Sequence, residues 1–222
     1  MTSRFNLSAL FFAAIVGASG SAQASITDPA NDFLPTYAGP KAGDLDVLTA
    51  SVSYDAHTNV FDFSATFNAP VGTTPGAFYV WGLDRGQGTE RFNTGPTPIG
   101  AGVKFDSVVI FQDGAVTVNR FSGAATVLPG DYTISGDTIS GSVSGSLLPS
   151  TGFTDADYTW NLWPRDALFS GNASISDFAP DASNAAVTAV PEPQSYALML
   201  AGLAGFTLLS RRRKTSSQQP AV

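Results

Sequence analysis

The apolar residues of this chain occur in short alternating stretches, and this pattern constrains the fold more than any other feature. From Phe61 to Phe67, every second residue is Phe or Ala, and the residues between them are Asp, Ser and Thr. A period of two places apolar side chains on one face of a β-strand and polar side chains on the other. Gly, Pro, Asn or Asp ends most of these stretches, and no amphipathic helical pattern occurs between residues 25 and 190. The sequence therefore predicts an all-β domain.

The predicted strands follow one another at intervals of about 8–12 residues. They cover residues 45–54, 61–67, 78–83, 105–112, 115–121, 132–135, 138–143, 158–163 and 173–178. Asp113-Gly114 and Gly136-Asp137 each separate two of these strands and predict tight hairpins. Pro164 is expected to end the strand before it. We therefore expect an antiparallel β-sandwich over residues 25–181, either jelly-roll-like or similar to a carbohydrate-binding module.

Two of these strands carry further information. Strict alternation along residues 45–54 places Val47 and Thr49 on one face and Ala50 on the other. Residues 78–83 are apolar on both faces, which is typical of a central strand covered on both sides. The sequence thus predicts which strand lies in the middle of a sheet.

The chain contains no Cys and a single His, and these counts exclude several kinds of site. Without Cys there are no disulfides, thiolate metal sites or Cys nucleophiles. His57 lies in a predicted turn beside Asp55 and Asn59, so we expect no Ser-His-Asp triad, and one His is too few for a catalytic zinc. A glycosidase-type pair would need an acid with a raised pKa. The sequence therefore predicts a domain with no catalytic residues, although an enzyme that acts on extracellular polysaccharide remains the alternative.

The charge of the folded part is strongly negative. Without Arg4 and the four cations of the C-terminal tail the chain keeps six cations, and without Glu192 it keeps 17 acids, so its formal charge is −11. Phosphate backbones repel such a surface, which excludes nucleic acid as a partner.

Acidic residues cluster at the start of the domain. The candidates for a calcium site are Asp28, Asp32, Asp44 and Asp46, because Ca²⁺ prefers hard oxygen ligands. The alternative is that these residues cap turns; no other cofactor is indicated. The segments Asp28–Phe33 and Asp177–Asp181 are similarly built, which indicates that the two ends of the domain lie close together.

Two residues are candidates for binding carbohydrate. Trp81 and Trp160 are expected in the core, and Trp163 then points the opposite way on its strand. Arg165 follows two residues later, so an exposed indole beside a guanidinium would form a platform for sugar rings. The alternative is that the Gly-rich loop of residues 84–102, or a second sheet, buries Trp163.

Both ends of the chain have the composition of targeting segments. One cation, Arg4, precedes an apolar run over residues 7–18, and Ala22-Gln23-Ala24 has the small-residue spacing of a cleavage site. Residues 1–24 are therefore predicted to be a signal peptide.

At the other end, residues 182–193 are predicted to form a linker that contains Pro191, Glu192 and Pro193. Residues 194–210 are uncharged and predict one transmembrane helix. Residues 211–222 are predicted to form a basic tail that remains on the cytoplasmic side. The topology signal in this tail consists of Arg211, Arg212, Arg213 and Lys214.

This order of Pro-Glu-Pro, short apolar span and Arg-rich cluster resembles the PEP-CTERM sorting domain of exported bacterial proteins. The resemblance covers only about the last 25 residues. It implies processing by an exosortase-type enzyme, transient anchoring in the bacterial inner membrane, and release to the cell surface or exterior of a bacterium that makes exopolysaccharide. We therefore expect a surface or matrix protein associated with exopolysaccharide or biofilm. A membrane-tethered carbohydrate-binding module is a further alternative.

Overall fold

The computed structural model describes residues 25–190 and 199–203, and the first of these ranges forms two antiparallel sheets. The first sheet has the order β1-β2-β3-β9-β8, with β12 also beside β2, and contains β1 (Ile26–Thr27), β2 (Val47–Asp55), β3 (Val60–Phe67), β8 (Tyr132–Ser135), β9 (Thr138–Ser144) and β12 (Thr188–Ala189). The second has the order β11-β10-β4-β5-β6-β7 and contains β4 (Ala77–Asp84), β5 (Ser107–Gln112), β6 (Ala115–Asn119), β7 (Thr126–Pro129), β10 (Thr159–Asp166) and β11 (Ala185–Ala186). Within residues 25–190 the helices are four short 3₁₀ turns. The all-β, antiparallel prediction is confirmed; among the strands of residues 25–190, only β12 pairs in parallel.

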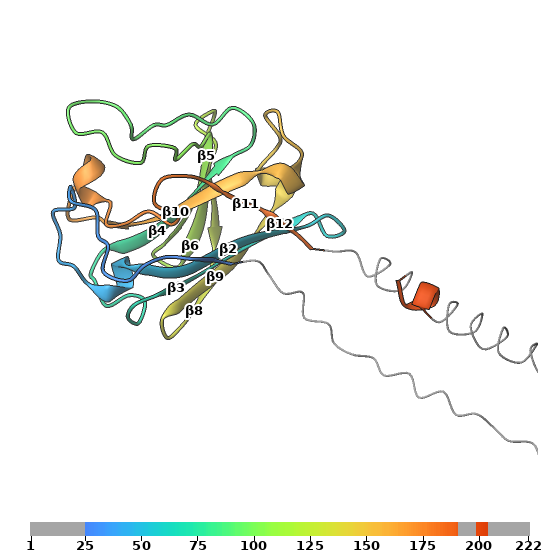
Figure 1. Ribbon diagram of the computed structural model, residues 1–222, viewed down its shortest axis with the longest axis horizontal. Helices are drawn as coiled ribbons and strands as arrows, with labels where there is room; N and C mark the ends of the chain where they lie inside the picture. The colour runs from blue at the N-terminus through green and yellow to red at the C-terminus, as the bar shows by residue number, and fades with distance from the viewer. Residues whose placement is uncertain (1–24, 191–198, 204–222) are drawn as a thin grey trace, which may run out of the picture.

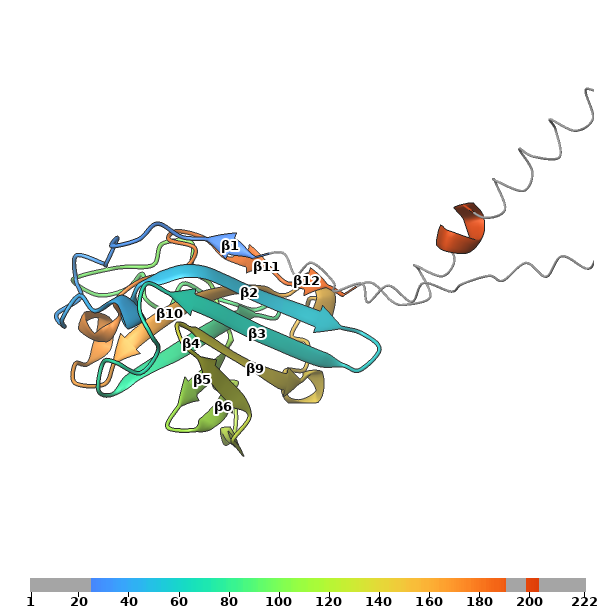
Figure 2. The same ribbon diagram turned by 90° about the horizontal axis from the view of Figure 1, so that it is seen from below.

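The two sheets share one hydrophobic core, and Figures 1 and 2 show them stacked face to face. Phe63 of β3 lies at the centre of this core, with its ring 5.8 Å from that of Trp81 on β4 and 6.2 Å from that of Phe111 on β5. Both contacts are edge-to-face, an arrangement that aromatic quadrupoles favour. β4 lies between β10 and β5, which confirms that residues 78–83 form a central strand.

A β-bulge in β2 changes which residues face the core. The pairing with β3 shifts between Val47 and Thr49, so that Val47 is opposite Phe67 and Thr49 is opposite Thr66. Val47 and Ala50 are therefore both buried, and the expectation that strict alternation separates them is wrong. A bulge inserts one extra residue, which reverses the faces of everything beyond it.

Both predicted hairpins form, but in different sheets. Asp113 and Gly114 have φ of 52° and 76°, the left-handed conformation that a tight turn between β5 and β6 requires. The second hairpin, between β8 and β9, belongs to the first sheet. β7, which the sequence did not predict, pairs with β6 before the chain crosses over.

Pro164 does not end its strand, which corrects the prediction. β10 continues to Asp166 and pairs with β4 along its whole length, with Pro164 opposite Tyr79. The carbonyl oxygen of Pro164 accepts a hydrogen bond from the amide of Ser176 on its other side, so its ring nitrogen also faces away from β4. No ladder hydrogen bond to β4 is lost, because the missing N–H lies on the side where β10 has little pairing.

The segment predicted as the last strand, residues 173–178, is not one. Gly171–Ser174 forms a 3₁₀ turn, and Ile175 makes only an isolated bridge to Arg165. Ile175 and Phe178 instead pack on the outer face of the second sheet, where burial replaces regular pairing.

The domain extends further than predicted, because β11 and β12 lie in the segment expected to be a linker. β12 pairs with β2, and the amide of Val190 donates a hydrogen bond of 2.9 Å to the carbonyl oxygen of Tyr54. β1 also pairs with β2, so both ends of the domain lie beside the same strand (Figure 2). The predicted signal peptide lies outside the described residues, as does most of the predicted transmembrane helix, of which residues 199–203 are helical. Within the described ranges, no helix has the length and apolar character needed to cross a membrane.

Candidate functional site

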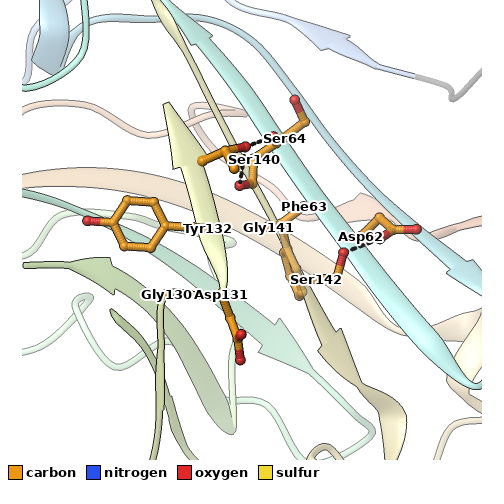
Figure 3. A pocket seen from close by; sticks show the side chains of 10 residues that line it. Asp62, Phe63, Ser64, Gly130, Asp131, Tyr132, Ser140, Gly141 and Ser142 are labelled. Atoms are coloured by element: carbon orange, nitrogen blue, oxygen red, sulfur yellow. Dashed lines mark hydrogen bonds between the residues drawn. The ribbon is translucent and has the colours of Figure 1, made fainter. Parts of the chain in front are cut away.

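A polar groove lies on the outer face of the first sheet (Figure 3). Its volume is about 550 Å³, and it is lined by residues of β3, β8, β9 and the turn before β8: Asp62, Phe63, Ser64, Gly130, Asp131, Tyr132, Thr133, Ser140, Gly141 and Ser142. Period-two alternation produces this groove, because the same strands point Phe61, Phe63 and Ile139 into the core. We call it the hydroxyl groove.

The side chains of the hydroxyl groove form rows across the strands. The registers place Ser64 opposite Ser140, Ser140 opposite Thr133, and Asp62 opposite Ser142. Within a row, residues on neighbouring strands are about 4.8 Å apart. Successive rows are about 6.7 Å apart, which is the distance between same-face residues along one strand. Hydroxyls both donate and accept hydrogen bonds, so this regular surface can pair with a partner that is itself rich in hydroxyls.

Two carboxylates also line the groove. The hydroxyl of Ser142 donates a hydrogen bond of 2.6 Å to Oδ1 of Asp62, while Asp131 is exposed. The ring of Tyr132 points away from both Asp62 and Ser142 (Figure 3), so the groove offers no aromatic platform on that side. Contact within the groove would therefore depend on hydrogen bonds.

The expectation that Trp163 is exposed is wrong. Its side chain is 2 % exposed and packs against Phe105 at 4.8 Å and Phe92 at 5.0 Å between ring centroids. A Cβ on Gly82 would overlap the indole, so this glycine provides the space beneath it. Phe92 belongs to the loop of residues 84–102, which is the alternative that the sequence left open. Trp163 does point away from the main core, as alternation predicts, but the outer face of the second sheet is itself apolar and is covered, so the ring is buried there in a second cluster.

Arg165 has a structural role in the described protein. Its Nε donates to Oγ of Ser174 at 2.9 Å, and one terminal nitrogen donates to the carbonyl oxygen of Gly171 at 2.9 Å. Burial lowers the pKa of its guanidinium. Trp163 and Arg165 do line one common pocket of about 320 Å³, but an exposed indole platform is absent from it.

The same pocket contains two residues that the sequence did not single out. The guanidinium of Arg91 lies 4.1 Å from the ring centre of Phe121, which is 43 % exposed and has a φ of 58°. A left-handed backbone is rare for a bulky residue. Only the isolated position of Phe121 between polar residues would have indicated an exposed ring.

Asp44 and Asp46 are held by the protein's own donors and do not meet Asp28 and Asp32 as expected. Asp44 accepts hydrogen bonds from the amide and hydroxyl of Thr74 at 2.7 and 2.6 Å. Asp46 accepts from the amide of Asn31 and from the side-chain amide of Asn68. Both carboxylates thus accept hydrogen bonds that stabilise neighbouring turns and loops. The prediction that they share a calcium site with Asp28 and Asp32 is corrected.

Asp28 and Asp32 come together with Asp177 instead. One carboxylate oxygen from each of the three residues lies within 4.8 Å of the other two. Asp177 was not predicted as a ligand, although its similarity to the Asp28 segment was the signal that could have indicated it. We call these three residues the acidic cluster.

The acidic cluster changes the protonation of its members. Burial, followed by the charge of Asp32 and Asp181, raises the pKa of Asp28 to about 7. Burial is also the largest cause that raises the pKa of Asp177 to about 8, with Asp28 and Asp32 adding to it. The amides of Val47 and Phe178 oppose this shift by donating to the Asp177 carboxylate.

Comparison with known protein families identifies the C-terminal segment. The family model of the PEP-CTERM protein-sorting motif matches residues 189–214, which include Pro191, Glu192 and Pro193 and the Arg-rich cluster. This match confirms the resemblance noted from the sequence and shows that the chain carries the sorting signal of an exported exosortase substrate. No significant match was found for this chain among curated proteins or among solved structures.

Proposed function

We propose that the two-sheet domain is a non-enzymatic component of the cell surface or extracellular matrix that associates with exopolysaccharide. The observation that carries this proposal is the matched sorting motif, which begins at residue 189, the last residue of β12. The sorting motif therefore follows the two-sheet domain without a separate domain between them. We infer that the motif serves to deliver this domain to the cell surface.

The tail supports a sequence of steps. Residues 194–210 form the transient membrane anchor, with Arg211 to Arg213 and Lys214 held at the cytoplasmic side. Pro191 and Pro193 disfavour a helix at this point of the sequence, because proline lacks an N–H and restricts the residue before it. In this proposal a membrane enzyme cleaves the chain near Pro-Glu-Pro, and the cleavage releases the domain.

The hydroxyl groove supports polysaccharide as the partner. Its Ser and Thr side chains offer donors and acceptors at the regular spacing of the sheet, and a sugar polymer presents hydroxyls repeatedly. Each such hydrogen bond contributes about 1 kcal/mol, so one site binds weakly. Repeated contacts along one polymer raise the effective concentration of the next contact, which makes weak sites useful in a matrix.

Intact-mass analysis of the protein secreted by its host tests the delivery step. We expect the mature protein to begin at Ser25 and to end near residue 193. A secreted form whose mass includes Arg211 to Arg213 would contradict processing. Recovery of the full-length protein only from membranes would instead favour the membrane-tethered module.

Polysaccharide binding is tested by retention of the secreted protein on matrix polysaccharide isolated from the same host. The double change Asp62→Ala and Ser142→Ala should weaken the affinity of the groove about 30-fold, since two adjacent contacts of about 1 kcal/mol each are lost. Thr117→Ala, on the outer face of the second sheet, is the matched control and should leave retention unchanged. Equal retention of the groove variant would remove the groove from the proposal.

One observation favours the enzymatic alternative: Asp62 and Asp131 line the same groove. Two carboxylates are what glycoside hydrolysis requires. Release of new reducing ends from the host polysaccharide, abolished by Asp131→Asn, would establish an enzyme and overturn the non-enzymatic proposal.

A further inference from the structure

We propose that Asp28, Asp32 and Asp177 bind one Ca²⁺ ion, which joins the entry and exit segments of the two-sheet domain. Asp28 follows β1 directly, and Asp177 lies between β10 and β11. The ion would therefore connect two parts of the chain that the sequence places far apart.

The distances within the acidic cluster suit a single ion. Ca²⁺ binds oxygen at about 2.3–2.6 Å, so two ligands on opposite sides of one ion are separated by roughly 4.6–5.2 Å. One oxygen from each of the three carboxylates lies within 4.8 Å of the other two. The three oxygens therefore lie close enough together to approach one ion.

A second observation is independent of this proximity. Both carboxylate oxygens of Asp32 and Oδ2 of Asp28 are shielded from solvent, although the two residues are partly exposed, and these oxygens accept no hydrogen bond from another described residue. A carboxylate oxygen that is shielded from water and has no hydrogen-bond donor destabilises the folded state unless a partner compensates its charge. The contrast with Asp44, whose oxygens both accept hydrogen bonds from Thr74, shows that the fold supplies donors where a carboxylate serves only the protein. Asp32 is left for a ligand.

The protein supplies no cation at this point. In residues 25–190 and 199–203 the single ion pair is Arg85 with Asp106, in another part of the domain. Asp177 is completely buried, and each of its oxygens accepts one amide hydrogen bond, from Val47 and from Phe178. A carboxylate oxygen has a second lone pair, so both oxygens remain able to bind a metal. The two amides hold the Asp177 carboxylate in a fixed orientation for this purpose.

The ligand set selects the ion. Three carboxylates with neither His nor Cys suit a hard cation and do not suit Zn²⁺. Mg²⁺ demands near-ideal octahedral geometry and keeps most of its water, whereas Ca²⁺ accepts irregular sets of six to eight oxygens completed by water. Extracellular Ca²⁺ modules have dissociation constants of about 10⁻⁴–10⁻³ M. A site of that affinity would fill after export, which the sorting motif provides.

Thermal unfolding of the full-length chain in a mild detergent, followed by tryptophan fluorescence, tests the proposal. In metal-free buffer, adding about 1 mM Ca²⁺ should raise the Tm by roughly 3–6 °C if the dissociation constant is about 10⁻⁴ M. Asp32→Asn keeps the shape of the side chain and removes its charge. Without Ca²⁺ this variant should be at least as stable as the unchanged chain, and it should lose the Ca²⁺-dependent shift. Asp113→Asn, in the exposed turn between β5 and β6, removes one charge elsewhere and should keep the shift.

Three results would overturn the proposal: no shift at any Ca²⁺ concentration up to about 10 mM, an equal shift with Mg²⁺, or an equal shift in Asp32→Asn. Should Asp32→Asn prove less stable without Ca²⁺, titration calorimetry decides the matter. Retained heat of Ca²⁺ binding in the folded variant contradicts the site, and its loss supports it.

Discussion

The backbone amide of Val47 donates a hydrogen bond of 3.0 Å to Oδ2 of Asp177, across 130 residues of the chain. Val47 is the first residue of β2, and Asp177 lies in the segment between β10 and β11. This hydrogen bond therefore joins the beginning of β2 to a segment near the C-terminal end of the domain. It also holds the Asp177 carboxylate beside Asp28 and Asp32.

Stability should depend on pH through this cluster when a chelator keeps metal away. The pKa of Asp28 is raised from 3.8 to about 7 and that of Asp177 to about 8, so the folded state binds protons more readily than the unfolded chain. The charges that face them are Asp32, Asp46 and Asp181. Stability is then greatest below the unfolded pKa and is lost as the pH rises through about 7–8.

We therefore expect the chelated protein to have a higher Tm at about pH 5 than at about pH 8.5. Thermal unfolding in the two buffers measures this difference. Asp113→Asn should keep the pH dependence, because it lies outside the cluster. A Tm that rises between these two pH values would contradict the raised pKa values.

Phe63 should be among the residues on which stability depends most. Phe63→Ala empties a site between the two sheets and should cost about 3–5 kcal/mol in the free energy of unfolding. Ser64→Ala, on the outer face of the same strand, should change it by less than about 0.5 kcal/mol. Urea unfolding measures both values, and similar costs for the two changes would mean that β3 is not the wall of a shared core.

The buried pair of Arg85 and Asp106 should also be sensitive to truncation. Nε of Arg85 donates to Oδ1 of Asp106 at 2.8 Å, and Thr151 donates to the other oxygen. Asp106→Ala leaves the buried guanidinium without its counter-ion and with only the carbonyl oxygens of Pro149 and residue 106 as acceptors, which costs about 3–5 kcal/mol. Asp131→Ala, an exposed acid, is the control in the same urea titration. A loss below about 1 kcal/mol for Asp106→Ala would show that water replaces the lost partner.

Tryptophan fluorescence should resist a soluble ionic quencher. Trp81, Trp160 and Trp163 are each at most 2 % exposed. Trp163→Phe should therefore lower the total emission without changing the small quenchable fraction. A clear fall in the quenchable fraction would mean that Trp163 is accessible after all.

The Arg-rich cluster should control membrane retention before cleavage. Replacing Arg211, Arg212, Arg213 and Lys214 by Ser removes the positive charge that holds the cytoplasmic end. We expect less uncleaved precursor in the inner membrane fraction of the host, measured by immunoblotting. Exchanging all three arginines for Lys preserves the charge and should preserve retention. If the neutral variant is still retained in the membrane, the apolar segment alone is a sufficient anchor and the Arg-rich cluster does not control retention.

Local patterns in the sequence determined the elements and the destination of this protein. The Phe61–Phe67 alternation predicts β3 with its buried face, because a strand repeats every two residues whatever lies around it. Asp113-Gly114 predicts the turn between β5 and β6, since few other pairs adopt two left-handed conformations at low cost. The sorting motif is likewise read within one continuous segment, and the family match bears it out.

Only the tertiary structure decided which of these patterns meet. The bulge in β2 reverses its faces, and β10 continues past Pro164 because the ring nitrogen faces away from β4, but neither pairing partner is visible in the local sequence. Trp163 is buried because a distant loop brings Phe92 over it. Asp177 lies beside Asp28 and Asp32 because the fold brings it to Val47, 130 residues away in the chain, where the two residues form a hydrogen bond. Contacts between residues far apart in the chain depend on how the sheets stack, and no local periodicity encodes that stacking.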